Sequence, residues 1–108
     1  MTQTITNCTP HDIVLRGVDG DTVFPPSGII PRMSVTTEEI PGLGFPCVMS
    51  LYGHIEGLPE MRKDTLLIVS SMVGQNSYRD DLIAPDTGPT AIRVNGQVAA
   101  VIRFQKFN

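Results

Sequence analysis

The sequence has no tryptophan, only two cysteines and few aromatic residues, which make up 6% of its 108 positions. Two thiols cannot build a four-cysteine zinc site, so a structural zinc centre of that kind is excluded. The first residues show neither the basic nor the apolar segment of a secretion signal, and no apolar run reaches the length of a membrane-spanning helix. We therefore expect a cytoplasmic protein in which Cys8 and Cys47 are reduced thiols.

Charged residues are also scarce, at 18% of the chain, and the net charge is −3. A protein that coats DNA or RNA needs a strongly basic face, so we expect no nucleic-acid partner, and no feature indicates a membrane partner. Six of the eight basic residues are arginine. Because a guanidinium group forms paired hydrogen bonds with phosphate or carboxylate, the composition stays compatible with a pocket in which a few arginines converge.

Turn-forming residues are abundant by contrast, with nine prolines and ten glycines along the chain. The apolar runs between them are short and mostly rich in valine and isoleucine, which favours many short strands. The length suits one domain, which we expect to cover residues 1–108. The expected fold class is α+β: a compact, predominantly antiparallel β domain with one short helix near residues 70–78.

Local patterns predict the elements of the first two-thirds of the chain. The expected strands cover residues 12–18, 21–24, 29–36, 47–56 and 65–69. Asp19-Gly20 suits a hairpin turn between the first two strands, and Pro31 places the third at a sheet edge. The last of these strands is continuously apolar, so we expect it to be buried. Ser70 or Ser71 would then cap a helix that runs to about Tyr78.

The last third of the chain predicts a turn-rich segment over 80–89, followed by a hairpin. Asn95-Gly96 suits a type I′ turn, because both central residues of that turn need a positive φ. Strands at 91–94 and 97–104 would flank the turn. Their expected register places Arg93 opposite Val98 and Ala91 opposite Ala100.

Sequence motifs of common enzymes are missing. There is no Gly-x-Ser-x-Gly nucleophile motif and no phosphate-binding Gly-x-x-x-x-Gly-Lys loop. Residues 54–56 read His-Ile-Glu, as in zinc deaminases, but the Pro-Cys-x-x-Cys that completes such a metal site does not follow. We therefore expect no catalysis and no cofactor. The enzymatic alternative is a small hydrolase that binds a divalent metal through Asp80, Asp81 or Asp86.

Several motifs along the chain carry a resemblance to a known group. They are Thr9-Pro10-His11, Pro25-Pro26-Ser27-Gly28, Val69-Ser70 at the end of an apolar strand, and the Arg-x-Asp-Leu-x-x-Pro pattern of residues 79–85. Together they cover most of the chain and resemble a group of short proteins encoded by bacteriophages and prophages. This resemblance implies a protein that acts in the cytoplasm of an infected bacterial host, where small acidic phage proteins disarm host defence.

The resemblance leads to one main hypothesis and one alternative. The main hypothesis is a homo-oligomeric binding protein that sequesters a nucleotide-derived immune signal, such as a cyclic oligonucleotide or a cyclic ADP-ribose isomer, without cleaving it. The alternative is an inhibitor or adaptor that docks a host protein through a strand edge or a loop. For the main hypothesis, arginines would contact phosphate, an aromatic ring or histidine would stack on a base, and further polar groups would enclose the ligand. The candidate ligand-binding residues are His11, Ser70, Arg79, Asp81, Thr87 and Arg93.

Overall fold

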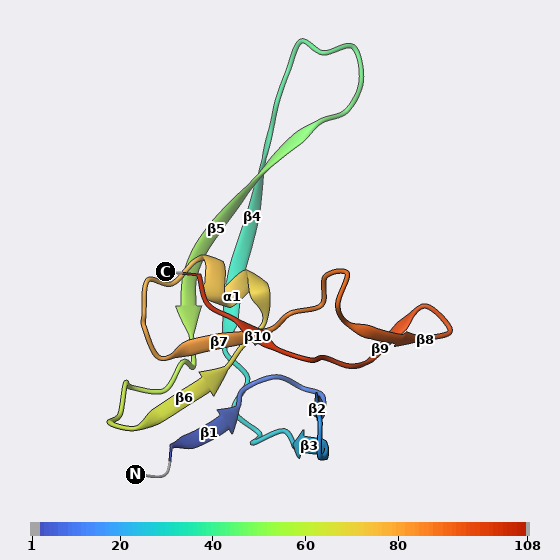
Figure 1. The fold of residues 1–108 in the computed structure, drawn as a ribbon. Helices are drawn as coiled ribbons and strands as arrows, with labels where there is room; N and C mark the ends of the chain where they lie inside the picture. The colour runs from blue at the N-terminus through green and yellow to red at the C-terminus, as the bar shows by residue number, and fades with distance from the viewer. Residues whose placement is uncertain (1–2, 108) are drawn as a thin grey trace.

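A four-stranded sheet forms the centre of the fold in the computed structural model, which describes residues 3–107 (Figure 1). Its strands, in order across the sheet, are β1 (Thr4–Asn7), β6 (Thr65–Ile68), β7 (Leu82–Pro85) and β10 (Phe104–Gln105). The first three run parallel to one another, and β10 is antiparallel to β7. The helix α1 (Ser71–Gln75) connects β6 to β7 and packs against β7.

The two inner strands of this sheet supply much of the core. Leu67, Ile68 and Val69 are almost completely buried, as are Leu82 and Ala84. Inner strands of parallel sheets are covered on both faces and therefore show continuous apolar runs. The buried strand that the sequence predicts at 65–69 is confirmed, with β6 ending at Ile68.

Three sequence predictions around this sheet are wrong in extent. The strand predicted at 97–104 ends at Ala100, and Phe104 belongs to β10 of the central sheet. The helix ends at Gln75 rather than near Tyr78, because Asn76 leaves helical geometry and its side chain donates to the carbonyl of Met72 at 2.8 Å. Short polar residues such as asparagine favour this competition with the helix backbone. The segment 80–89 is also more than turns, since Leu82–Pro85 forms the buried strand β7.

Three antiparallel hairpins surround the sheet: β2 (Ile13–Gly17) with β3 (Gly20–Phe24), β4 (Arg32–Glu39) with β5 (Val48–Glu56), and β8 (Ile92–Val94) with β9 (Gln97–Ala100). Antiparallel pairs thus predominate among the described residues, which form many strands and one short helix, as the sequence predicts. The first hairpin turns at Val18-Asp19 rather than at Asp19-Gly20, because Gly20 pairs with Gly17. The strand predicted at 29–36 begins only after Pro31.

The last hairpin confirms its predicted turn but not its whole register. Asn95 and Gly96 have φ values of 54° and 80°, as a type I′ turn requires. Arg93 lies opposite Val98 as expected. A bulge then shifts the pairing, so that Ala100 faces Ile92 instead of Ala91. A bulge inserts one unpaired residue into one strand, so every position beyond it moves by one.

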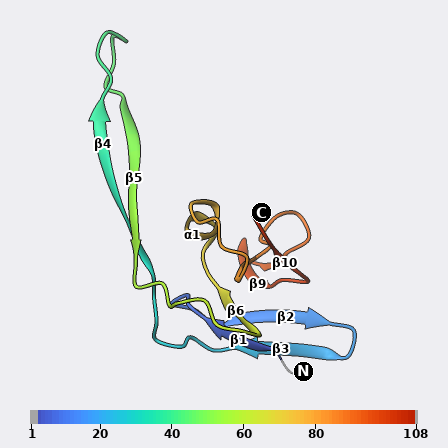
Figure 2. The ribbon, with the colours of Figure 1, turned by 90° about the vertical axis from the view of Figure 1, so that its left-hand side faces the viewer.

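The β4–β5 hairpin projects from the body as a long two-stranded arm, which Figure 2 shows from the side. Only its base reaches the core, where Ile55 and the following Leu58 pack against the buried cluster around Leu67 and Val73. The radius of gyration is 16.6 Å, whereas a compact chain of this length would measure about 13 Å. The arm accounts for this elongation.

Candidate functional site

The turn that follows β1 is built on a buried asparagine. Asn7 is 2% exposed, and its Nδ2 donates to the carbonyl oxygens of His11 and Phe24 at 2.8 and 2.7 Å. Its Oδ1 accepts from the backbone N–H and the hydroxyl of Thr9 at 2.9 and 2.7 Å. Ser27 donates to the Asn7 carbonyl through both its N–H and its hydroxyl. The Thr-Pro-His and Pro-Pro-Ser-Gly motifs therefore meet at Asn7, which fixes the backbone of His11.

Three loops gather at one edge of the central sheet because three of its strands are parallel. The loop after β1 carries His11, Ser70 lies two residues beyond the end of β6, and the loop after β7 carries Thr87. In open sheets with parallel strands, ligands bind outside the carboxyl ends of the strands. This carboxyl edge is therefore the place where the topology favours a binding site.

A groove of about 230 Å³ lies at this edge (called the carboxyl-edge groove below). One of its walls is apolar and comes from Val98 to Val101, where the chain continues beyond β9 and bonds to β2. The N–H of Val101 donates to the carbonyl of Val14 at 2.9 Å, and the N–H of Arg16 donates to the carbonyl of Val101 at 2.8 Å. The polar side chains of the lining are His11, Asp12 and Thr87.

Two arginines hold the loop beside the groove. Arg103 Nε donates to Asp86 Oδ2 at 2.6 Å, and the other carboxylate oxygen accepts from the N–H of Gly88 at 3.0 Å. These bonds, with that to Arg103 first, keep the pKa of Asp86 below its usual value. Arg93 donates to the carbonyls of Thr87 and of Gly88, the latter at 3.1 Å. Arg93 therefore holds the backbone at Thr87, Arg103 holds the side chain of Asp86, and both arginines are exposed.

Arg79 and Asp81 do not line this groove. They form a paired ion bridge with distances of 2.9 and 2.6 Å at the start of β7, whereas the groove lies beyond its end. Asp81 is 6% exposed, and a buried carboxylate requires such a partner. The backbone of Asp81 also belongs to the central sheet, because its carbonyl oxygen accepts from the N–H of Leu67.

The six candidate residues from the sequence therefore divide into two groups. His11 and Thr87 line the groove, and Arg93 bonds to the carbonyl of Thr87. Ser70 lies at the same edge, but its hydroxyl accepts from Val73 N at 3.3 Å and caps α1. Arg79 and Asp81 bind each other at the opposite end of β7.

Other residues of the site were missed by sequence reasoning. Asp12 and the apolar wall at 98–101 line the groove because the chain after β9 pairs with β2, a non-local contact without a local signal. Asn7 was missed as a positioning residue. A detectable signal was the Asn-x-Thr pattern at residues 7–9, since asparagine side chains favour turns that bond to backbone two residues ahead.

Neither cysteine belongs to this site. Cys8 lies in the buried cluster, where burial raises the pKa of its thiol, and Cys47 lies in the arm.

Across residues 3–107, no three His, Cys, Asp or Glu side chains gather as a metal site would require. A second hollow of about 320 Å³ lies between β1, β6 and the loop at 59–62.

Comparisons with protein-family models, with curated proteins and with solved structures find no match to this chain. In the part of the chain that the structure describes, no helix has the length and apolar character needed to cross a membrane.

Proposed function

We propose that this chain is a non-catalytic binding protein that sequesters a nucleotide-derived small molecule in the carboxyl-edge groove. The observation that carries the proposal is the composition of that groove: an apolar wall beside His11, Asp12 and Thr87, with Arg93 and Arg103 bonded to the loop that carries Thr87. An apolar wall can receive the flat face of a base, a histidine can stack or donate, and arginine binds phosphate.

The size of the groove limits how much ligand one chain would hold. Its volume of about 230 Å³ is below the roughly 300–1,000 Å³ of most small-molecule sites. One groove would therefore take a single base or nucleotide unit, and the rest of a larger signal would lie outside it. The biological setting is supported by the resemblance to short phage proteins alone: a protein that withholds a cyclic oligonucleotide or a cyclic ADP-ribose isomer from host defence in the cytoplasm of the infected cell.

A capture-and-release assay tests this proposal. The purified protein is incubated with cyclic dinucleotides, cyclic trinucleotides, cyclic ADP-ribose isomers and linear nucleotides, separated from free ligand, heat-denatured and analysed by mass spectrometry. We expect one class to be recovered intact. Arg93→Ala removes a charge-assisted contact and should weaken retention by about 10- to 100-fold. Ala99→Trp should abolish it by filling the groove.

The matched control is Arg16→Ala. Arg16 is also an exposed arginine on a hairpin, but its side chain pairs with Asp21 and neither residue lines the groove. The substitution keeps the backbone N–H that bonds to Val101, so retention should be unchanged. Recovery of a chemically altered nucleotide would overturn the non-catalytic assignment. If nothing in the panel is retained, the nucleotide assignment is wrong.

A second candidate function, the inhibitor or adaptor that docks a host protein, is favoured by one observation. The arm has an unpaired edge on each strand within the described residues, and an edge of this kind can accept a strand of another protein. This function predicts that affinity capture recovers a stoichiometric host partner. Changes in the arm should abolish the capture, and Arg93→Ala should not affect it.

A further inference from the structure

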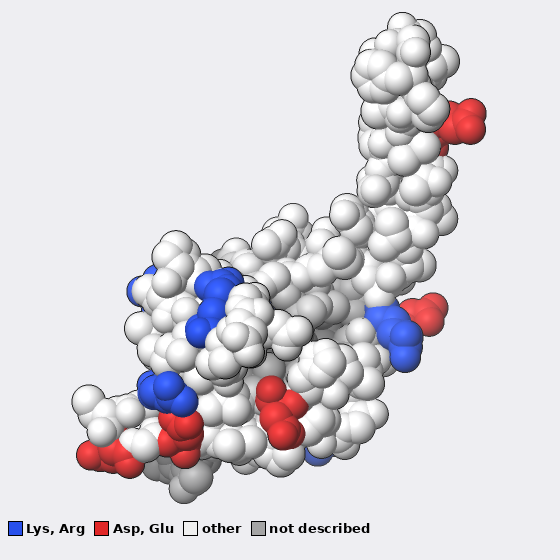
Figure 3. Space-filling view, turned by 90° about the vertical axis from the view of Figure 1, so that its right-hand side faces the viewer, with Lys and Arg blue, Asp and Glu red and all other residues white. Residues whose placement is uncertain are grey.

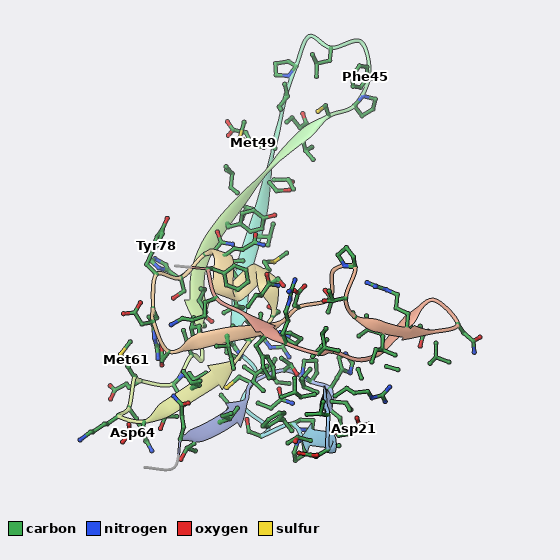
Figure 4. All side chains as sticks on the ribbon, in the orientation of Figure 1. Asp21, Phe45, Met49, Met61, Asp64 and Tyr78 are labelled. Carbon is green, nitrogen blue, oxygen red and sulfur yellow. The ribbon has the colours of Figure 1, made fainter. Side chains whose placement is uncertain are left out.

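The arm exposes several large apolar side chains to solvent. Phe45 at its tip is 65% exposed, and Val35, Leu43 and Met49 are about half exposed. Figure 4 shows Phe45 at the tip and Met49 along the arm, both away from the body. A hairpin of two strands is marginally stable in water at best, and exposed apolar patches of this kind mark interaction sites.

The two edges of the arm differ in regularity. Between the pairs Met33–Ile55 and Val35–Tyr52, β5 carries one residue more than β4. This bulge includes Gly53, where any side chain would overlap the hydroxyl of Ser34. Bulges interrupt the edge of a strand and hinder further pairing. The free edge of β4 is therefore the edge that suits another strand.

Charge on β4 is arranged so that the strand complements itself when reversed. Arg32 begins the strand, and Glu38 and Glu39 end it. Between residues 33 and 55, these two glutamates are the only Asp, Glu, Lys or Arg residues. Figure 3 shows acidic atoms on one side of the outer arm, and one basic and one acidic group next to each other at its base. Within the hairpin, Arg32 lies opposite Glu56. None of the three side chains takes part in an ion pair among the residues described.

A twofold axis determines which of these charges can meet. Consider two copies of a strand that pair antiparallel about a twofold axis perpendicular to the sheet. A given residue then lies on the same face of the joint sheet in both copies. Paired positions must then be both odd or both even, because side chains alternate between faces. Arg32 and Glu38 satisfy this condition, and the axis would pass through Val35. Arg32 and Glu39 do not satisfy it.

We propose that a second copy of this chain docks on the arm through antiparallel pairing of the two β4 edges about Val35. Each Arg32 then faces Glu38 of the other copy, which gives two equivalent ion pairs. In the same register, the tip of each arm, which holds Leu43 and Phe45, extends toward Ile29 and Ile30 of the other copy. Both isoleucines are about two-fifths exposed just before β4.

The exposed apolar area would supply part of the interface, and the paired strand edges and polar side chains would have to supply the rest. From their exposed fractions, Ile29, Ile30, Val35, Leu43 and Phe45 offer roughly 450 Å² per copy. Two copies thus supply roughly 900 Å² before strand edges and polar side chains are added, and stable interfaces bury about 1,200–2,000 Å² in total.

Sedimentation of the full chain over a range of concentrations tests the proposal, with charge reversal as the specific probe. We expect a dimer for the natural sequence. Glu38→Arg replaces two attractions by two repulsions and should weaken dimerisation by about tenfold. Adding Arg32→Glu should restore it. Val35→Lys brings two ammonium groups to the axis and should give a monomer.

Glu39→Arg is the matched control, because it makes the same charge change one residue away on the opposite face and should leave the dimer intact. Circular dichroism confirms that each variant keeps its strand content. A monomer at all concentrations overturns the proposal, and so does a dimer that tolerates Val35→Lys. If Glu38→Arg and Glu39→Arg have equal effects, the proposed register is wrong. These outcomes do not depend on nucleotide retention, so this inference and the proposed function fail separately.

Discussion

The substitution Asn7→Asp is the sharpest test of how the turn at His11 is held. Asn7 uses both of its N–H donors, toward the carbonyls of His11 and Phe24. Aspartate has the same shape but presents only oxygen to these two acceptors at neutral pH. Leaving a buried acceptor without a donor costs about 1–3 kcal/mol. Because these bonds are partly buried, we expect about 1–2 kcal/mol for each and about 2–4 kcal/mol in total.

Equilibrium urea unfolding measures this loss, followed by circular dichroism because the chain has no tryptophan. With an m value of about 1.5 kcal/mol/M, a loss of about 3 kcal/mol lowers the midpoint by about 2 M. The deficit should also depend on pH. Burial against two carbonyls raises the folded-state pKa of the introduced carboxyl group above its unfolded value of about 3.9, so the folded state loses stability as pH rises through that range. The deficit is therefore largest at neutral pH and shrinks toward pH ~4.

The control is Asn95→Asp, which makes the same chemical change in the exposed type I′ turn. Asp-Gly suits that turn nearly as well as Asn-Gly, so we expect a change within about 0.5 kcal/mol. Equal unfolding midpoints for the two variants would refute the assignment of Asn7 as the residue that organises this turn.

Three further substitutions test local features of the fold. Gly74→Ala should destabilise the fold, because the new Cβ would overlap the ring of Phe107. In a Phe107→Ala background, the same change should instead stabilise the fold by about 1 kcal/mol. Thermal melts of the natural sequence, the two single variants and the double variant measure this coupling. Since Arg103 lowers the pKa of Asp86, their ion pair stabilises the fold above pH ~4 and is lost as pH falls through the folded-state pKa. Asp86→Asn should therefore lower the melting temperature at neutral pH, with the difference from the natural sequence vanishing in acid. Gly96→Ala should cost about 1 kcal/mol in urea unfolding, because its φ of 80° strains any side chain; an unchanged midpoint would contradict the turn type.

The candidate site was partly predictable from the sequence. His11, Thr87 and Arg93 were chosen for their chemistry, and the structure places them in or beside one groove. Arg79 and Asp81 were chosen on the same grounds but bind each other instead. Residue type indicates which groups can bind an anion. It does not indicate whether an internal partner two residues away already uses them.

The sequence by itself determined the short-range features of this protein. The type I′ turn at Asn95-Gly96, the Ser70 cap and the buried strand after Thr65 depend on neighbouring residues, whose φ preferences and hydrogen bonds act locally. Tertiary structure alone decided the parallel pairing of β1 with β6, which joins Thr4 to Thr65, and the bond between β2 and the chain after β9. Such pairings depend on which distant apolar faces can be buried together, and this is a property of the whole chain. The groove at the carboxyl edge exists because of these long-range contacts.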